Sequence, residues 1–353
     1  MSTFISHSLL LLLLLLSTPF VSSDCTCDAS DPEARTHEKA LALKLKLVAL
    51  FAILFIGAVG VCLPMLGHRF ECLQADKSVF FLIKAFAGGV ILATGLIHVL
   101  PDAFESLTSP CLDENPWGLF PFTGFIAMMA AIAAHMIDSS ALSYYESLYS
   151  KMPPQLVADE EKSIAVHTHA SHGHAHGGSA PSDSDHSTSR RSELIKHRVI
   201  SHVLELGIVV HSVIIGISLG ASESPDTIKP LIAALSFHQF FEGMGLGGCI
   251  YQAEFRKLPR VIMVLFFALT TPVGVGIGML ISNIYAESSR NALIVEGTLN
   301  AASAGILIYM SLVDLLAAAF SNPIVKKNFK LQVGANVFLL LGAGCMSLLA
   351  KWA

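Results

Sequence analysis

Two segments of the sequence place a histidine ahead of a glycine-rich stretch within an otherwise apolar run. They read HSVIIGISLG from His211 and HQFFEGMGLG from His238, and both follow one pattern: His, four residues, Gly, two residues, Leu-Gly. His238 and Glu242 are four residues apart, so they share one face of a helix. An imidazole nitrogen and a carboxylate oxygen suit Zn²⁺ and other divalent first-row metals. The two segments are therefore candidates for a metal site.

The positions next to each histidine can supply further ligands. His211 would give a third strong ligand, and Ser212 and Gln239 would give neutral oxygens. The alternative is that both histidines only make hydrogen bonds in a packed core. Ionisable residues inside apolar segments are costly and usually functional, so two matched histidines with a glutamate favour metal binding. The predicted metal ligands are His211, Ser212, His238, Gln239 and Glu242.

Further ionisable residues lie at the ends of the apolar runs. The segment HVLPDAFE carries a histidine and two acids at one predicted membrane surface, where acidic groups would raise the local concentration of cations. A weaker set at the opposite surface would pass the metal onward. The alternative is a solvated helix end at the first surface and ordinary interfacial residues at the second. The predicted entrance residues are His98, Asp102 and Glu105, and the predicted exit residues are Asp138, His202 and Glu205.

The elements that must hold these residues are membrane-spanning helices. Charged residues make up 14% of the 353 residues, against about 25% in a soluble domain, and hydrophobic residues make up 53%. Long apolar runs predict an all-α membrane protein in a lipid bilayer. The net charge of −5 gives no indication of a nucleic-acid partner. The eight predicted spans are 45–66, 79–100, 119–139, 199–220, 230–251, 261–282, 294–319 and 331–350.

The basic residues of the short loops predict the orientation of these spans. The three loops placed inside carry eight Lys or Arg residues, and the three placed outside carry two. Because short cytosolic loops are the more basic, both ends of the mature chain are expected outside the cytosol. The fourth and fifth spans would run antiparallel. Their GxxxG spacings, Gly216/Gly220 and Gly243/Gly247, would allow close helix contact.

The chain is predicted to begin with a cleaved signal peptide, residues 1–23. The Leu9–Leu16 run is too short to span a membrane comfortably, and small residues follow it. The alternative is a retained first membrane helix. On the oxidising side of the membrane, a disulfide from Cys25 or Cys27 to Cys111 is left open.

The segment between the third and fourth spans differs from the rest of the chain. It is rich in Ser, Asp and His and lacks apolar periodicity, which predicts a disordered loop. Its clustered imidazoles would bind metal weakly as a sensor or buffer, and the alternative is a solvated spacer. These histidines are His167, His169, His172, His174 and His176. The chain is thus divided into the signal peptide (1–23), spans one to three (24–139), the cytosolic His-rich loop (140–198) and spans four to eight (199–353).

Taken together, these features resemble the ZIP (Zrt-, Irt-like protein) family of divalent metal transporters, most closely its plant branch. The resemblance covers almost the whole mature chain. It rests on the HSVIIGISLG, HQFFEGMGLG and HVLPDAFE segments, the eight-span layout and the His-rich loop. It implies secondary transport of Zn²⁺ toward the cytosol, with Fe²⁺, Mn²⁺ or Cd²⁺ as further substrates, through the five predicted ligands. Zinc would be the transported substrate, and no cofactor is expected.

The resemblance also implies details of the site and its setting. Some members of the family carry a second metal site, with an acidic residue one turn after the first histidine, whereas this chain has Ile215 there. A single transport site is therefore favoured. The family implies an elevator-like movement of one helix group against another. The expected location is the plasma membrane, with an endomembrane or the vacuolar membrane as alternatives, and a homodimer is left open.

Two other functions fit parts of the pattern. A zinc exporter of the cation-diffusion-facilitator type also has a His-rich loop, but it usually has six spans and a soluble C-terminal domain. An intramembrane metalloprotease would need HExxH with a third ligand. This sequence has His238-Gln239-Phe-Phe-Glu242 in its place, so no enzyme activity is expected.

Overall fold

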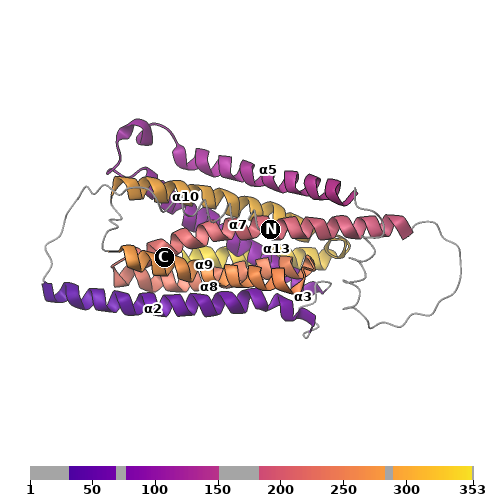
Figure 1. The fold of residues 1–353 in the computed structure, drawn as a ribbon, viewed down its shortest axis with the longest axis horizontal. Coiled ribbons are helices and arrows are strands. Elements are labelled where there is room, and N and C mark those ends of the chain that lie inside the picture. The colour runs from indigo at the N-terminus through magenta and orange to yellow at the C-terminus, as the bar shows by residue number, and fades with distance from the viewer. Residues whose placement is uncertain (1–31, 69–76, 151–182, 283–288, 352–353) are drawn as a thin grey trace.

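The structure is a computed structural model that describes residues 32–68, 77–150, 183–282 and 289–351, and these residues contain helices and no strand. The long helices lie side by side along one direction (Figure 1). They are α2 (Pro32–Cys62), α3 (Ser78–Ala93), α5 (Phe122–Ser150), α7 (Asp183–Ala221), α8 (Pro225–Gln252), α9 (Lys257–Ile281), α10 (Arg290–Tyr309) and α13 (Phe329–Leu349). The shorter segments are η1 (Pro64–His68), η3 (Thr94–Val99), α4 (Leu100–Leu107), η4 (Glu114–Gly118), η5 (Met310–Ala317), α11 (Ala318–Ser321) and α12 (Pro323–Lys326).

Seven helical stretches of the described chain are long and apolar enough to cross a membrane. They are Lys39–Leu66, Ser78–Leu107, Phe122–Tyr144, His197–Ala221, Lys257–Ile281, Arg290–Ser321 and Phe329–Leu349, and each overlaps a predicted span. The remaining predicted span, 230–251, lies within α8, which is one unbroken helix. Polar residues such as His238, Gln239 and Glu242 interrupt the apolar run of α8, which is not among the seven.

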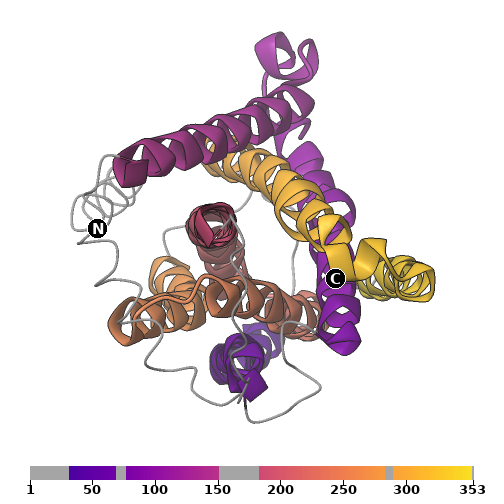
Figure 2. The same ribbon diagram turned by 90° about the vertical axis from the view of Figure 1, so that its right-hand side faces the viewer.

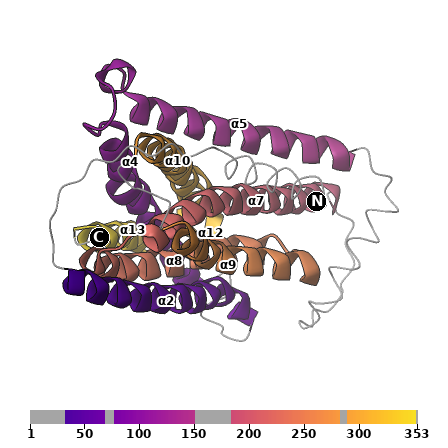
Figure 3. The ribbon, with the colours of Figure 1, turned by 60° about the vertical axis from the view of Figure 1, so that its left-hand side comes forward.

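The long helices form two groups, which are most easily seen along their axes (Figure 2). In the first group, α7 packs against α9, while α2 packs against both α8 and α9. In the second group, α3 packs against α13, and α10 packs against α4 and α5. The second group forms an arc, and α7 and α8 of the first group lie against its concave side. α5 and α2 lie on opposite sides of the whole bundle (Figure 3).

Local sequence explains several helix starts. Pro225 follows Ser224 and occupies the first turn of α8, where a missing backbone N–H costs nothing. Ser289 and Asn328 precede α10 and α13, and their side-chain oxygens accept hydrogen bonds from the backbone N–H groups of Ala292 and Leu331. These caps fix where the chain re-enters the bundle after each loop.

Helices extend into the predicted His-rich loop, 140–198, from both sides. α5 continues to Ser150, and α7 begins at Asp183. Ala141 and Leu142 pack against Ile195, Val199 and Val203 in a small apolar cluster. This packing extends both helices beyond the stretch that apolar composition alone identifies.

The GxxxG glycines of α7 and α8 make close helix contacts. Their partners are α9 and α2, and not each other. A Cβ atom built on Gly216 would lie 2.6 Å from the Thr271 carbonyl oxygen of α9. A Cβ on Gly243 would lie 2.8 Å from the Val61 backbone nitrogen of α2. The glycines of α7 thus fit α9, and those of α8 fit α2. Small residues allow the backbones of neighbouring helices to approach this closely in membrane proteins.

Three predictions fall on residues outside the described ranges: the signal peptide at 1–23, the histidines of 167–176, and Cys25 and Cys27. Cys111 is described, and its thiol is exposed.

Candidate metal centre

The antiparallel helices α7 and α8 bring together three of the predicted ligands. His211 comes from α7, and His238 and Glu242 come from successive turns of α8. One ligand atom from each of the three lies within 4.8 Å of the other two. The ring centroids of His211 and His238 are 5.6 Å apart. Two imidazoles and one carboxylate therefore converge from two helices, as a divalent metal site requires.

The three side chains are buried, with at most 1% of each residue exposed. Both ring nitrogens of His211 and both carboxylate oxygens of Glu242 lack a hydrogen-bond partner among the described residues. Both ring nitrogens of His238 also lack a partner that meets hydrogen-bond geometry among the described residues. Buried polar atoms without partners are unfavourable, so a ligand that occupies them would be bound with little competition.

The two neutral residues of the predicted site are arranged differently from each other. Ser212 is fully buried, and its hydroxyl has no described partner. Gln239 is also buried, but the Thr271 hydroxyl of α9 donates to its Oε1 atom over 3.2 Å. The Gln239 side chain also packs against Gly57 of α2, where a Cβ atom would lie 3.2 Å from its Cγ. The amide oxygen of Gln239 is thus engaged with α9, whereas the Ser212 oxygen remains available.

Of the predicted entrance residues, His98 lies nearest to the three ligands. It sits in η3, a π-helical turn, and its ring centroid is 6.2 Å from that of His238. His98 Nδ1 is 4.0 Å from Asp102 Oδ2 one turn later, and its Nε2 is buried without a partner. Asp102 is half-buried and Glu105 is exposed. These residues form a graded series from the exposed surface to the buried ligands.

Sequence analysis missed Glu296 of α10, which belongs to this entrance. The Glu296 and Glu105 carboxylates both lie close enough to Asp102 to repel its charge. Glu296 is an acidic residue within an apolar stretch of the chain. Such a residue is usually functional, so the sequence alone could have identified it. Three carboxylates from α4 and α10 therefore gather at this end of the bundle.

The predicted exit residues do not form one cluster. The Tyr309 hydroxyl donates to Asp138 Oδ2 over 3.2 Å, which joins α10 to α5. His202 Nδ1 is 3.9 Å from Glu205 Oε2 on α7, and the His202 ring packs against Phe255. Ile215, at the position of the missing acidic residue, is buried in an apolar cluster with Ile53 and Val275.

A second residue that sequence analysis missed is Lys84 of α3. It lies within the predicted span 79–100 and is 6% exposed. Its Nζ atom donates to Gln252 Oε1 of α8 over 3.1 Å. A lysine inside an apolar run is usually functional, so Lys84 could have been identified from the sequence alone.

Known proteins that are similar to this chain are named as zinc transporters or as Fe(2+) transport proteins. The family model of the ZIP zinc transporters matches residues 43–350. The chain is 50% identical over 336 residues to Zinc transporter 5 of Oryza sativa subsp. japonica, covering 94% of this chain and 93% of that protein. It is 51% identical over 330 residues to Zinc transporter 3 of Arabidopsis thaliana, with 93% and 90% covered. It is 50% identical over 333 residues to Fe(2+) transport protein 1 of Oryza sativa subsp. japonica, with 92% and 88% covered.

Proposed function

Because this chain belongs to the ZIP family, we propose that it transports divalent metal ions, zinc foremost, across a membrane toward the cytosol. Zinc is the transported substrate. Iron is the second candidate, since the chain is equally similar to a protein named as an Fe(2+) transporter. The ZIP family is one of transporters, so the protein is not assigned an enzyme activity. Because the chain belongs to this family, it is not assigned to either alternative, the exporter of another family or the intramembrane protease.

The observation that carries the proposed site is the convergence of His211, His238 and Glu242 in the protein interior. A dication that enters this space loses its hydration shell, and nitrogen and oxygen ligands replace it. The single carboxylate offsets part of the metal's charge. Ligands of this kind exchange readily, whereas thiolates would bind zinc more tightly and slow its release. Ser212 would complete the coordination from α7.

The entrance residues give the metal a route to this site. Asp102, Glu105 and Glu296 concentrate cations at the outer end of α4 and α10. His98 lies between this acidic end and His238, and it would hand the ion to the buried ligands. Since all the ligands belong to the first helix group and His98 to the second, a shift between the groups would move the ion away from the entrance. Asp138, His202 and Glu205 remain candidates for the exit.

The membrane arrangement is part of the proposal. α8 would be the eighth span, because it lies between spanning helices of both groups. The basic bias of the short loops would put both mature ends outside the cytosol, after removal of a signal peptide at 1–23. The membrane would be the plasma membrane. The histidines of 167–176 would then face the cytosol and bind metal weakly, outside the transport route.

Uptake of radiolabelled zinc by cells that express the protein tests this function. Faster accumulation than in vector-only cells is expected, and iron, manganese and cadmium are measured in parallel under the same conditions. Net loss of labelled zinc from preloaded cells would reverse the proposed direction. No flux of any of the four metals, from protein present at the cell surface, would contradict transport at that membrane.

A further inference from the structure

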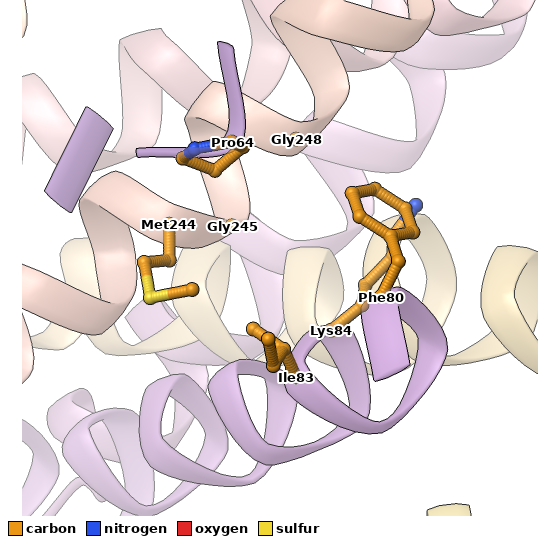
Figure 4. Close-up of a pocket in the computed structure, with 7 residues that line it drawn as sticks. All are labelled: Pro64, Phe80, Ile83, Lys84, Met244, Gly245 and Gly248. Atoms are coloured by element: carbon orange, nitrogen blue, oxygen red, sulfur yellow. The ribbon is translucent and has the colours of Figure 1, made fainter. Parts of the chain in front are cut away.

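The Lys84 side chain occupies the boundary between the two helix groups. Phe80, Ile83 and Lys84 extend from α3 toward Met244, Gly245 and Gly248 of α8, with Pro64 of η1 beside them (Figure 4). The residues that line this pocket together with Lys84 are apolar. A buried ammonium in such surroundings needs hydrogen bonds, and Gln252 Oε1 supplies one. A hydrogen bond from a charged donor is roughly twice as strong as one between neutral groups.

This hydrogen bond joins elements of different groups. Gln252 is the last residue of α8, the helix that carries His238 and Glu242, while α3 belongs to the second group. Two other long-range side-chain hydrogen bonds each stay within one group. Thr271 to Gln239 lies in the first, and Tyr309 to Asp138 lies in the second.

The apolar surfaces around Lys84 fit loosely, in contrast to the opposite side of α8. Cβ atoms built on Gly245 and Gly248 would reach ordinary contact distances, 3.5 Å from Ile91 and 3.4 Å from Phe80. A Cβ on Gly247 would instead collide with the Val61 carbonyl of α2. Close backbone contact therefore fixes α8 to α2, whereas Gly245 and Gly248 leave room for a Cβ atom at the boundary between α8 and α3. At this boundary the Lys84–Gln252 hydrogen bond is a specific polar connection between α3 and α8.

The charge of Lys84 has compensation that does not depend on α8. Lys84 and Asp314 both act electrostatically on the Cys249 thiol, which places the three groups in one neighbourhood. Asp314 lies in η5, in the same helix group as Lys84. If α8 moves, Asp314 remains in the helix group of Lys84, where its charge can offset part of the cost of a buried ammonium group. The bond to Gln252 is then the one that movement of α8 breaks.

We propose that Lys84 is a positioning residue for transport, which holds the inner end of α8 against α3 and releases Gln252 when the site opens to the cytosol. The inference rests on the proposed function, because it assigns the bond to one end of the transport cycle. Lys84 lies six residues from the start of α3, and Gln252 lies at the end of α8; the loop orientation puts both ends at the cytosolic surface. While the bond is intact, α3 and α8 seal the site on this side.

Cys249 offers a built-in reporter of this opening. It is 1% exposed, lies on α8 one turn before Gln252, and becomes reachable when α8 separates from α3. Inside-out membrane vesicles holding the full chain are treated with N-ethylmaleimide, and alkylation of Cys249 is followed by peptide mass spectrometry. Gln252→Met, which removes the acceptor, should speed alkylation about tenfold, and Gln252→Glu, which adds an opposite charge, should slow it about tenfold. Gln332→Met on the exposed surface of α13 is the matched control and should leave the rate unchanged.

Zinc uptake by the same variants separates this inference from the proposed function. Gln252→Glu should lower the maximal uptake rate and leave the half-saturating zinc concentration near the normal value, since the ligands are untouched. Alkylation at the normal rate in both Gln252 variants, or a shift in the same direction in both, would overturn the role of Lys84 while zinc uptake stands. Absence of uptake in the unmodified protein would instead contradict the proposed function, whatever the alkylation rates.

Discussion

Replacing Glu242 with Gln removes the one carboxylate among the three converging ligands and changes little else. The side chain keeps its length and one oxygen, but the charge that offsets the metal is lost. The site is fully buried, so water cannot replace that charge. Removing one partner of a buried charge pair costs about 2–5 kcal/mol, which corresponds to at least about 30-fold weaker metal binding. Zinc uptake at concentrations below saturation should fall by a similar factor.

The structure also offers matched comparisons for this change. Asp226 lies on the same helix and is exposed, so Asp226→Asn makes the same chemical change without reaching the site and should leave uptake unaffected. Glu242→Asp keeps the charge and shortens the side chain by one methylene group. Because metal–ligand distances tolerate only about 0.2 Å, this variant should retain a small part of the uptake.

Thermal unfolding of the purified protein distinguishes metal binding from a structural role. A ligand at about 100 times its dissociation constant stabilises the folded state by about 2.7 kcal/mol. Zinc should therefore raise the unfolding temperature of the unaltered protein and fail to do so for Glu242→Gln. Without zinc, the variant should be at least as stable, because it no longer buries an unpaired carboxylate. Normal uptake by Glu242→Gln, or equal stabilisation by zinc, would refute the reasoning and return both histidines to a packing role.

Three further outcomes are expected. Asp102→Asn should reduce zinc uptake chiefly at low zinc, because the carboxylate concentrates ions and does not bind them in the buried site; an equal loss at saturating zinc would place it among the ligands. Gly220→Ala should destabilise the purified protein by about 1–3 kcal/mol, because its Cβ would lie 2.9 Å from Gly278 Cα, whereas Gly276→Ala, with no atom within 4 Å, should not. Deletion of residues 167–176 should leave initial zinc uptake largely intact and alter only the response to high zinc; complete loss of uptake by protein at the cell surface would contradict this.

The helical content and the grouping of His211, His238 and Glu242 could be predicted from the sequence because both depend on local pattern. Apolar runs of spanning length appear without knowledge of any partner, and seven of them overlap helices that are long and apolar enough to cross a membrane. His238 and Glu242 share a helix face because residues four positions apart lie on the same side of a helix. His211 of α7 could be added to these two residues because its segment repeats the motif that begins at His238. The family, too, could be identified from these short segments, and the family model confirms it.

Contacts between distant segments were decided only by the tertiary structure. The sequence could not indicate that the glycines of α7 meet α9 and those of α8 meet α2, because a GxxxG spacing carries no information about its partner. The bond from Thr271 to Gln239 and the approach of His98 to His238 likewise depend on how separate helices rotate and shift as they pack. Lys84 was visible in the sequence as a charge in an apolar run. Its partner, Gln252, lies 168 residues away and was set by the packing of α3 against α8.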